Sequence, residues 1–132
     1  MKAKPRIADF MATELVTLTP ETEINRAMKT LLDERVSGAP VLDAKGQLVG
    51  LLSKKDCLRA VLSSSYYQEW GGTVADYMSS PVETLEADLE LVQAAEKFLA
   101  SHFRLFPVMR DGRLAGQISR TDVLRGLTEN WL

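Results

Sequence analysis

The sequence predicts a mixed α/β (α+β) protein made of two copies of one β-α-β-β-α unit. Three observations predict it. Ile7-Ala-Asp-Phe-Met11 returns 67 residues later as Val74-Ala-Asp-Tyr-Met78. Gly50-Leu-Leu-Ser-Lys-Lys-Asp56 likewise returns as Gly116-Gln-Ile-Ser-Arg-Thr-Asp122. The matches keep one order through nearly all of each half, and apolar spacing alternates between strand and helix periods, so chance is a poor explanation.

Length, charge and cysteine content limit the classes of protein that the sequence can encode. The 132 residues suit one domain, and a half of about 60 residues would be marginally stable alone. The net charge of -2 argues against a general nucleic-acid binder. No apolar run reaches the length of about 18 residues that a membrane span needs, and no signal peptide is evident. Cys57 is the only cysteine, so no intrachain disulfide can form, and we expect a cytoplasmic protein.

The first unit is expected to begin with a short strand over residues 15–18, which are rich in residues that favour strands. Thr19 suits the N-cap of a helix, and Pro20 suits its first position. The helix should have an apolar face at helical spacing, formed by Ile24, Ala27, Met28, Leu31 and Leu32. Gly38 and Pro40 rule out a longer helix.

A hairpin and a last helix complete the first unit. Residues 39–42 and 47–52 are predicted to form two strands joined by a turn over residues 43–46. The last helix should start at Ser53 and have an inner face made of Cys57, Leu58, Val61 and Leu62. Because Cys57 matches Val123 in the repeat, we expect it to be a small core residue.

The second unit should repeat this plan. Its first helix has an apolar face made of Leu91, Ala94, Ala95, Phe98 and Leu99. Glu86-Ala87 replaces the capping pair of the first unit, which leaves this helix start less well capped unless Asp88 takes over. Residues 105–109 and 113–118 form the predicted hairpin around a turn at 110–112, and residues 121–128 form the last helix.

A connector over residues 63–73 joins the two units. Its edges are rich in Ser and Gly, whereas its middle contains Tyr66, Tyr67 and Trp70. These aromatic residues either cover the junction of the units, or contribute to a dimer surface or the wall of a ligand cleft.

The repeated Gly-x-x-Ser-x-x-Asp stretch has two possible roles. Ser53 and Ser119 can cap a helix, with Asp56 and Asp122 at the third helical position, an arrangement close to a capping box. A helix start also presents free backbone N–H groups, which can bind an anion such as phosphate. The same residues suit both roles, so both interpretations stay open.

Together these stretches resemble a CBS domain, and the tandem pair resembles a Bateman module in a stand-alone CBS domain protein. The resemblance rests on the paired segments at Asp9 and Val74, on Gly38-Ala-Pro-Val41 and Leu105-Phe-Pro-Val108, and on the two Gly-x-x-Ser-x-x-Asp stretches. It indicates CBS repeats at residues 7–62 and 74–128 with the connector at 63–73. The family implies a pseudo-twofold pair forming one compact module, ligand clefts between the repeats, and often a disc-shaped dimer.

The resemblance also implies a ligand and a binding site. Such modules often bind AMP, ADP or ATP, and S-adenosylmethionine is the less favoured ligand here. The Asp of each stretch would accept hydrogen bonds from the ribose hydroxyls, and the Ser hydroxyl would reach phosphate. The expected ligand-binding residues are Ser53, Asp56, Ser119, Asp122, Thr17, Thr84, Lys54, Arg120, Thr121, Gly38, Ala39, Pro40, Phe106 and Pro107.

The basic residues and the threonines among these expected site residues also have a simpler structural interpretation. The basic residues beside the motifs can be a solvated helix start, and the threonines can reflect strand propensity. Further residues that could face a cleft are Lys55, Arg35, His102 and Arg104. Small residues at Gly38 and Ala39 contrast with Phe103 and Phe106 in the second copy, so we expect the two clefts to differ in affinity.

We therefore expect a non-catalytic regulatory module that senses an adenine nucleotide. It would be a homodimer that regulates an unknown protein in trans, with no nucleic-acid or membrane partner and no required cofactor. The alternative is a structural dimerisation or partner-binding module with degenerate, ligand-free clefts. One His and one Cys support neither a zinc site nor a catalytic triad, so an enzyme is the least expected class.

Overall fold

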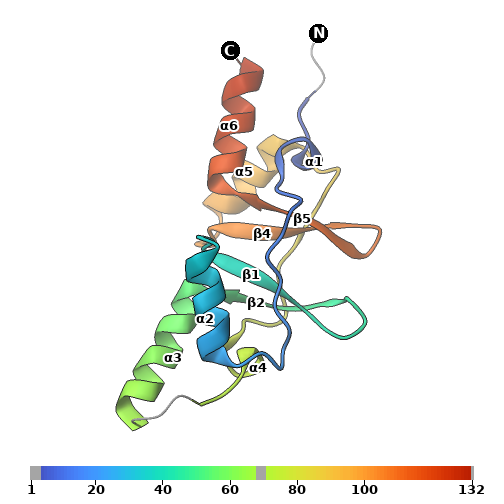
Figure 1. Ribbon diagram of the computed structural model, residues 1–132. Helices are drawn as coiled ribbons and strands as arrows, with labels where there is room; N and C mark the ends of the chain where they lie inside the picture. Colours follow the sequence, from blue (N-terminus) through green and yellow to red (C-terminus); the bar gives the residue numbers. More distant parts are fainter. Residues whose placement is uncertain (1–3, 68–70, 132) are drawn as a thin grey trace. The chain divides into compact units, whose positions relative to one another are not determined.

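The structure is a computed structural model that describes residues 4–67 and 71–131 (Figure 1). Helices and short strands alternate in both halves of the chain, which confirms the predicted mixed α/β class. The chain divides into two compact units. We call Val16–Val82 the first unit, and Met1–Leu15 together with Glu83–Leu132 the second unit. Each unit buries its own cluster of apolar side chains.

The first unit contains an antiparallel pair of strands, β1 (Gly38–Leu42) and β2 (Leu48–Ser53). Its helices are α2 (Ile24–Asp33), α3 (Lys54–Tyr67) and α4 (Val74–Tyr77). The core cluster brings together side chains from every one of these elements: Leu18, Ile24, Ala27, Leu31, Ala39, Val41, Leu52, Cys57, Ala60 and Val74. Cys57 is therefore the core residue that the sequence predicts.

The second unit contains a three-stranded sheet. β3 (Leu85–Glu86) runs parallel to β4 (Leu105–Arg110), which is antiparallel to β5 (Arg113–Ser119). The helices are α1 (Ile7–Phe10), α5 (Leu91–Leu99) and α6 (Arg120–Trp131). Asp111 and Gly112 have φ values of 52° and 77°, the left-handed conformation that a two-residue hairpin turn requires. The predicted turn at residues 110–112 is therefore confirmed.

The short helix that opens each sequence repeat packs into the unit formed mainly by the other repeat. Ile7 of α1 is fully buried in the core of the second unit, and its backbone N donates to Leu89 O at 2.9 Å. Val74 of α4 is fully buried in the core of the first unit, and its N donates to Thr22 O at 2.9 Å. The sequence repeats and the compact units thus divide the chain at different places.

The predicted start of the first long helix is wrong. α2 begins at Ile24 with Glu23 at the N-cap, whereas Thr19 hydrogen-bonds through its hydroxyl to Thr22 at 2.7 Å. Residues 19–23 cannot extend the helix because their carbonyls hold α4: Ala75 N donates to Pro20 O at 3.0 Å. The predicted strand at residues 15–18 is likewise reduced to one parallel bridge, between Leu18 and Val41.

The sequence also placed several leucines on the wrong side of their helices. Leu58 and Leu62 of α3 are 64% and 71% exposed, because this helix buries Asp56 and Ala60 beside Cys57, the one of its predicted inner-face residues that is buried. The other predicted inner-face residues that are exposed are Leu32, Val61 and Leu99. In the connector, Tyr66 is exposed, and the predictions for Trp70 and the side chain of Tyr67 lie outside the described residues.

Candidate functional site

The candidate site of the first unit lies where β2 ends and α3 begins. Ser53 is the last residue of β2, and Asp56 lies in the first turn of α3. Asp56 N donates to Ser53 Oγ at 3.2 Å, and Asp56 Oδ2 accepts from Ser53 N at 2.8 Å and from Ser53 Oγ at 2.9 Å. This reciprocal pairing confirms the capping interpretation.

Arg59 completes the surroundings of Asp56. Its Nη2 donates to Asp56 Oδ1 at 2.7 Å, and only 4% of the Asp56 side chain is exposed, against 56% for Arg59. A carboxylate this buried is stable only when charged or strong donors satisfy it. Three hydrogen-bond donors, two from Ser53 and one from Arg59, meet that need.

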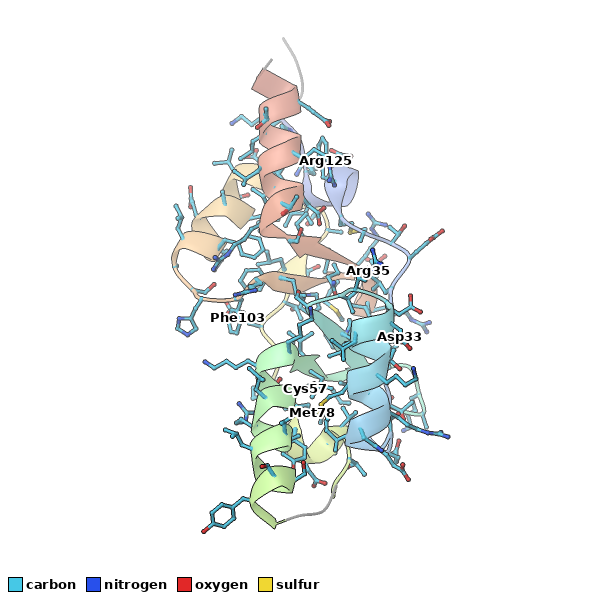
Figure 2. All side chains as sticks on the ribbon, turned by 60° about the vertical axis from the view of Figure 1, so that its left-hand side comes forward. Asp33, Arg35, Cys57, Met78, Phe103 and Arg125 are labelled. Atoms are coloured by element: carbon cyan, nitrogen blue, oxygen red, sulfur yellow. The ribbon has the colours of Figure 1, made fainter. Side chains whose placement is uncertain are left out.

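The second unit repeats this geometry between β5 and α6. Asp122 N donates to Ser119 Oγ at 3.1 Å, and Asp122 Oδ2 accepts from Ser119 N at 2.9 Å. Arg125, which Figure 2 labels on α6, donates to Asp122 Oδ1 at 2.8 Å. Asp122 is more open, with 16% of its side chain exposed. Among the described residues, the hydroxyl of Ser119 makes no hydrogen bond to the carboxylate, unlike that of Ser53, so Asp122 Oδ2 accepts fewer hydrogen bonds than Asp56 Oδ2.

The two arginines are site residues that sequence reasoning did not include. Each lies three residues after the aspartate, so one helical turn brings the pair together. The available signal was the repeat itself, since Arg59 and Arg125 match at the same offset as Asp56 and Asp122.

The strand register brings the predicted middle-strand residues beside the serines. Gly38 pairs with Ser53, and Pro40 pairs with Leu51. Because side chains alternate along a strand, these four positions share one face of the hairpin, while Ala39 is on the core face and fully buried. Thr17 is exposed and directly precedes Leu18, which bridges to β1.

In the second unit, Pro107 pairs with Gln117 and lies on the same face of the sheet as Ser119. Thr84 directly precedes β3, the strand beside β4. Phe106 is on the opposite face and 1% exposed, with its ring centroid 4.8 Å from that of Phe98 in the core. The structure thus places Ala39 and Phe106 in their cores, and their role in ligand binding stays a prediction.

Gln117 is a polar residue at a position that is apolar in the first repeat, since its counterpart is Leu51. Its Oε1 is buried and lacks a hydrogen-bond partner within the described part of the chain. Sequence reasoning passed over this residue, although the replacement of Leu by Gln between two otherwise matched strands was visible.

The predicted basic residues lie at the surface around the two helix starts. Lys54, Lys55, Arg120 and Thr121 are exposed in the first turns of α3 and α6. Arg120 Nε donates to Phe103 O at 3.0 Å and so joins α6 to the loop before β4, which also contains His102 and Arg104. Arg35, labelled in Figure 2, follows α2 with φ 56°.

Within residues 4–67 and 71–131, no group of three or more His, Cys, Asp or Glu residues could hold a metal ion. No helix in this part of the chain is both long and apolar enough to cross a membrane. Cys57 is buried, and burial, followed by the charge of nearby Asp56, raises the pKa of its thiol.

Comparison with known proteins places this geometry in a family context. The sequence model of the CBS domain matches residues 7–63 and 74–129. A crystal structure of CBSX2 in complex with AMP is 29% identical, with a TM-score of 0.85, and the match covers 97% of this chain and 99% of that chain. CBSX2 is a CBS-pair protein from Arabidopsis thaliana.

Two longer proteins contain a similar segment. The uncharacterized protein MJ1225 of Methanocaldococcus jannaschii is 30% identical over 125 residues, which are 95% of this chain and 44% of MJ1225. The A-adding tRNA nucleotidyltransferase of Aquifex aeolicus is 28% identical over 127 residues, 96% of this chain and 15% of that enzyme. The chain therefore spans less than half the length of these two relatives.

Proposed function

This chain belongs to the CBS domain family, and we propose that it is a non-catalytic regulatory module that binds an adenine nucleotide of the AMP, ADP or ATP type. Each unit has a helix start where a buried carboxylate and a serine hydroxyl lie at the end of a strand. The occurrence of this junction in both units is the observation that carries the proposal. The AMP complex of CBSX2, at 29% identity, supports the choice of ligand class.

Different residues bind the ribose, the phosphate and the base of the proposed ligand. Asp56 and Asp122 accept hydrogen bonds from the ribose hydroxyls, and the serine hydroxyls donate to phosphate at the positive end of the helix dipole. For this, Ser53 turns its one hydroxyl proton away from Asp56 Oδ2, which frees a second position on that carboxylate. The exposed side chains of Lys54, Arg120 and Thr121 supply charge and further donors for phosphate. The base contacts the strand residues, which are Thr17, Gly38, Ala39 and Pro40 in the first unit and Thr84, Phe106 and Pro107 in the second.

A thermal-shift panel of AMP, ADP, ATP and S-adenosylmethionine tests the proposal. A ligand at 100 times its dissociation constant should add about 2.7 kcal/mol to the free energy of unfolding. Calorimetric titration should then show that Asp56→Ala and Asp122→Ala each weaken binding at their own site by about ten- to a hundredfold, while circular dichroism shows the fold retained. Absence of a shift with all four compounds, or unchanged affinity in both variants, contradicts the proposal.

The second candidate is a dimerisation or partner-binding module, which the exposed apolar side chains favour. Leu32 and Leu99 occupy matching positions in the two repeats, as do Leu58 and Leu124, and all four are more than 60% exposed. Exposed leucines that recur at matching positions are suited to an interface. We propose that the chain forms a homodimer through them, and dimer formation without any nucleotide binding would favour this second candidate alone.

A further inference from the structure

Arg59 contacts two groups that are far apart in the sequence. Its Nη2 donates to Asp56 Oδ1 at 2.7 Å and to the backbone oxygen of Tyr77 at 2.9 Å. Tyr77 is the last residue of α4, so its carbonyl has no partner within this helix. One guanidinium nitrogen therefore joins the motif carboxylate to the end of α4.

The segment after Tyr77 is attached to the strand that carries the motif. Ser79 N donates to Leu51 O at 2.9 Å, and Leu51 N donates to Ser79 O at 3.1 Å. Met78, labelled in Figure 2, packs so closely on Gly50 that a Cβ there would lie 2.3 Å from its Sδ. Residues 77–79 are thus held by the same stretch that forms the site, and the first unit ends shortly afterwards, at Val82.

The second unit provides a natural comparison. Ala12 N donates to Gln117 O at 2.8 Å and Gln117 N donates to Ala12 O at 3.0 Å, which matches the Ser79 and Leu51 pair. Arg125 contacts Asp122, but among the described residues it makes no hydrogen bond to the end of α1. Within the described part of the chain, the connection from the motif carboxylate to the short helix is therefore found in the first unit, where that helix is α4.

The Asp56 carboxylate has room for one further donor. An ionised carboxylate offers about four lone-pair positions. Three are engaged in this structure, by Ser53 N, Ser53 Oγ and Arg59 Nη2. A donor from a ligand could therefore join the carboxylate without displacing Arg59, and it would hold the carboxylate and the arginine in their present geometry.

We propose that Arg59 is a positioning residue that joins Asp56 to residues 77–79, so that a ligand bound to Asp56 slows the opening of this segment. The effect of the ligand rests on the proposed function, whereas the contacts of Arg59 with Asp56 and Tyr77 do not. Occupation of the first unit's site then acts on the chain segment that leads out of that unit, and the site of the second unit lacks this connection.

Amide hydrogen exchange of the ligand-free protein tests whether Arg59 stabilises residues 77–79. Loss of a hydrogen bond from a stable segment should speed opening about fivefold or more. Arg59→Gln should therefore accelerate exchange at Ser79 and Leu51, and leave Ala12 and Gln117 unchanged. Arg125→Gln is the matched control and should accelerate neither pair. Unchanged exchange at Ser79 and Leu51 in Arg59→Gln overturns the inference, as does equal acceleration of the Ala12 and Gln117 pair in Arg125→Gln.

The same measurement with saturating AMP tests the effect of the ligand. AMP should slow exchange at Ser79 and Leu51 several-fold in the wild type and in Arg125→Gln, and have no such effect in Arg59→Gln. If AMP binds but protects these amides equally in Arg59→Gln, the inference fails while the proposed function stands. If AMP, ADP and ATP do not bind the wild type, the proposed function fails, and the ligand-free exchange rates still decide whether Arg59 holds the segment.

Discussion

Asp56 illustrates how one residue can stabilise the fold and form a site. Its carboxylate caps α3 through Ser53, is paired with Arg59 and is nearly inaccessible, so its charge is fully compensated within the first unit. Such pairing fixes the orientation of a buried carboxylate, which is what recognition of ribose hydroxyls requires. Asp122 makes fewer contacts and is more exposed, so the two residues are chemically alike but differently constrained.

Cys57 leads to a prediction about pH. Burial, and then the adjacent Asp56 charge, raises the pKa of its thiol above the ordinary value of 9.0. The neutral thiol is therefore favoured in the folded state. Its contribution to stability is complete below pH 9 and is lost as the pH rises through the higher folded pKa. Urea unfolding between pH 8 and pH 11 should show this loss, and it should be smaller in Cys57→Val, which copies Val123. An identical pH dependence in both proteins would contradict this assignment.

Gln117 leads to a prediction about stability. A buried acceptor without a partner costs about 1–3 kcal/mol, and the matching position in the other repeat is Leu51. Gln117→Leu should therefore raise the free energy of unfolding by about 1 kcal/mol, measured by urea denaturation. The reciprocal change Leu51→Gln serves as the control and should lower it. If Gln117→Leu destabilises the protein, Oε1 is satisfied in solution.

At the scale of elements, the short helices α1 and α4, each packed in the unit formed mainly by the other repeat, explain the glycine that both motifs share. Gly116 has no room for a Cβ, which would lie 2.6 Å from Met11 Sδ and 2.7 Å from the backbone oxygen of Ala12. Gly50 receives Met78 in the same way. The glycine of each Gly-x-x-Ser-x-x-Asp stretch is therefore needed for close packing of the segment that follows the short helix, a role separate from any ligand.

The packing of α1 in the second unit also predicts which unit an N-terminal substitution destabilises. Ile7 is fully buried in the core of the second unit, although it opens the first sequence repeat. Ile7→Ala should cost about 2–5 kcal/mol and speed hydrogen exchange in β5 and α6 before it affects β1 and β2. Val74→Ala is the matched control and should act first on the first unit. The reverse order of exchange would mean that each helix packs within its own repeat.

At the scale of the whole molecule, each unit has its own core, and apolar side chains remain outside both. Leu58 and Leu62 of α3 are exposed, as are Leu124, which matches Leu58 in the other repeat, and the matching pair Leu32 and Leu99. Exposure of several large apolar side chains is typical of a surface that associates with another molecule. This is the physical basis for the homodimer included in the proposed function.

Leu58 and Leu124 test the proposed homodimer. Replacing both with Asp places charges where apolar side chains would be buried, so the double variant should sediment as a monomer at concentrations where the wild type is a dimer. Lys45→Asp, a charge change in the exposed hairpin turn, is the control and should remain dimeric. A dimer that persists in the double variant would place the interface elsewhere.

The sequence by itself determined the repeat, the mixed α/β class and the two hairpins, and it gave helix capping as one of two possible roles for Ser53 and Asp56. These features depend on local spacing and turn chemistry, which one stretch of chain contains completely. The CBS family was also evident from the ordered motifs, and the family match over both repeats confirms it.

The tertiary structure alone decided which repeat each short helix joins, where α2 begins and which leucines are exposed. Thr19 and Pro20 carry the signals of a helix start, yet their segment supplies backbone oxygens to α4, more than fifty residues away in the chain. Leu58 fits an apolar stripe as well as Cys57 does, because the period of a helix does not reveal which side faces the core. These outcomes depend on contacts between distant segments, and local pattern does not contain that information.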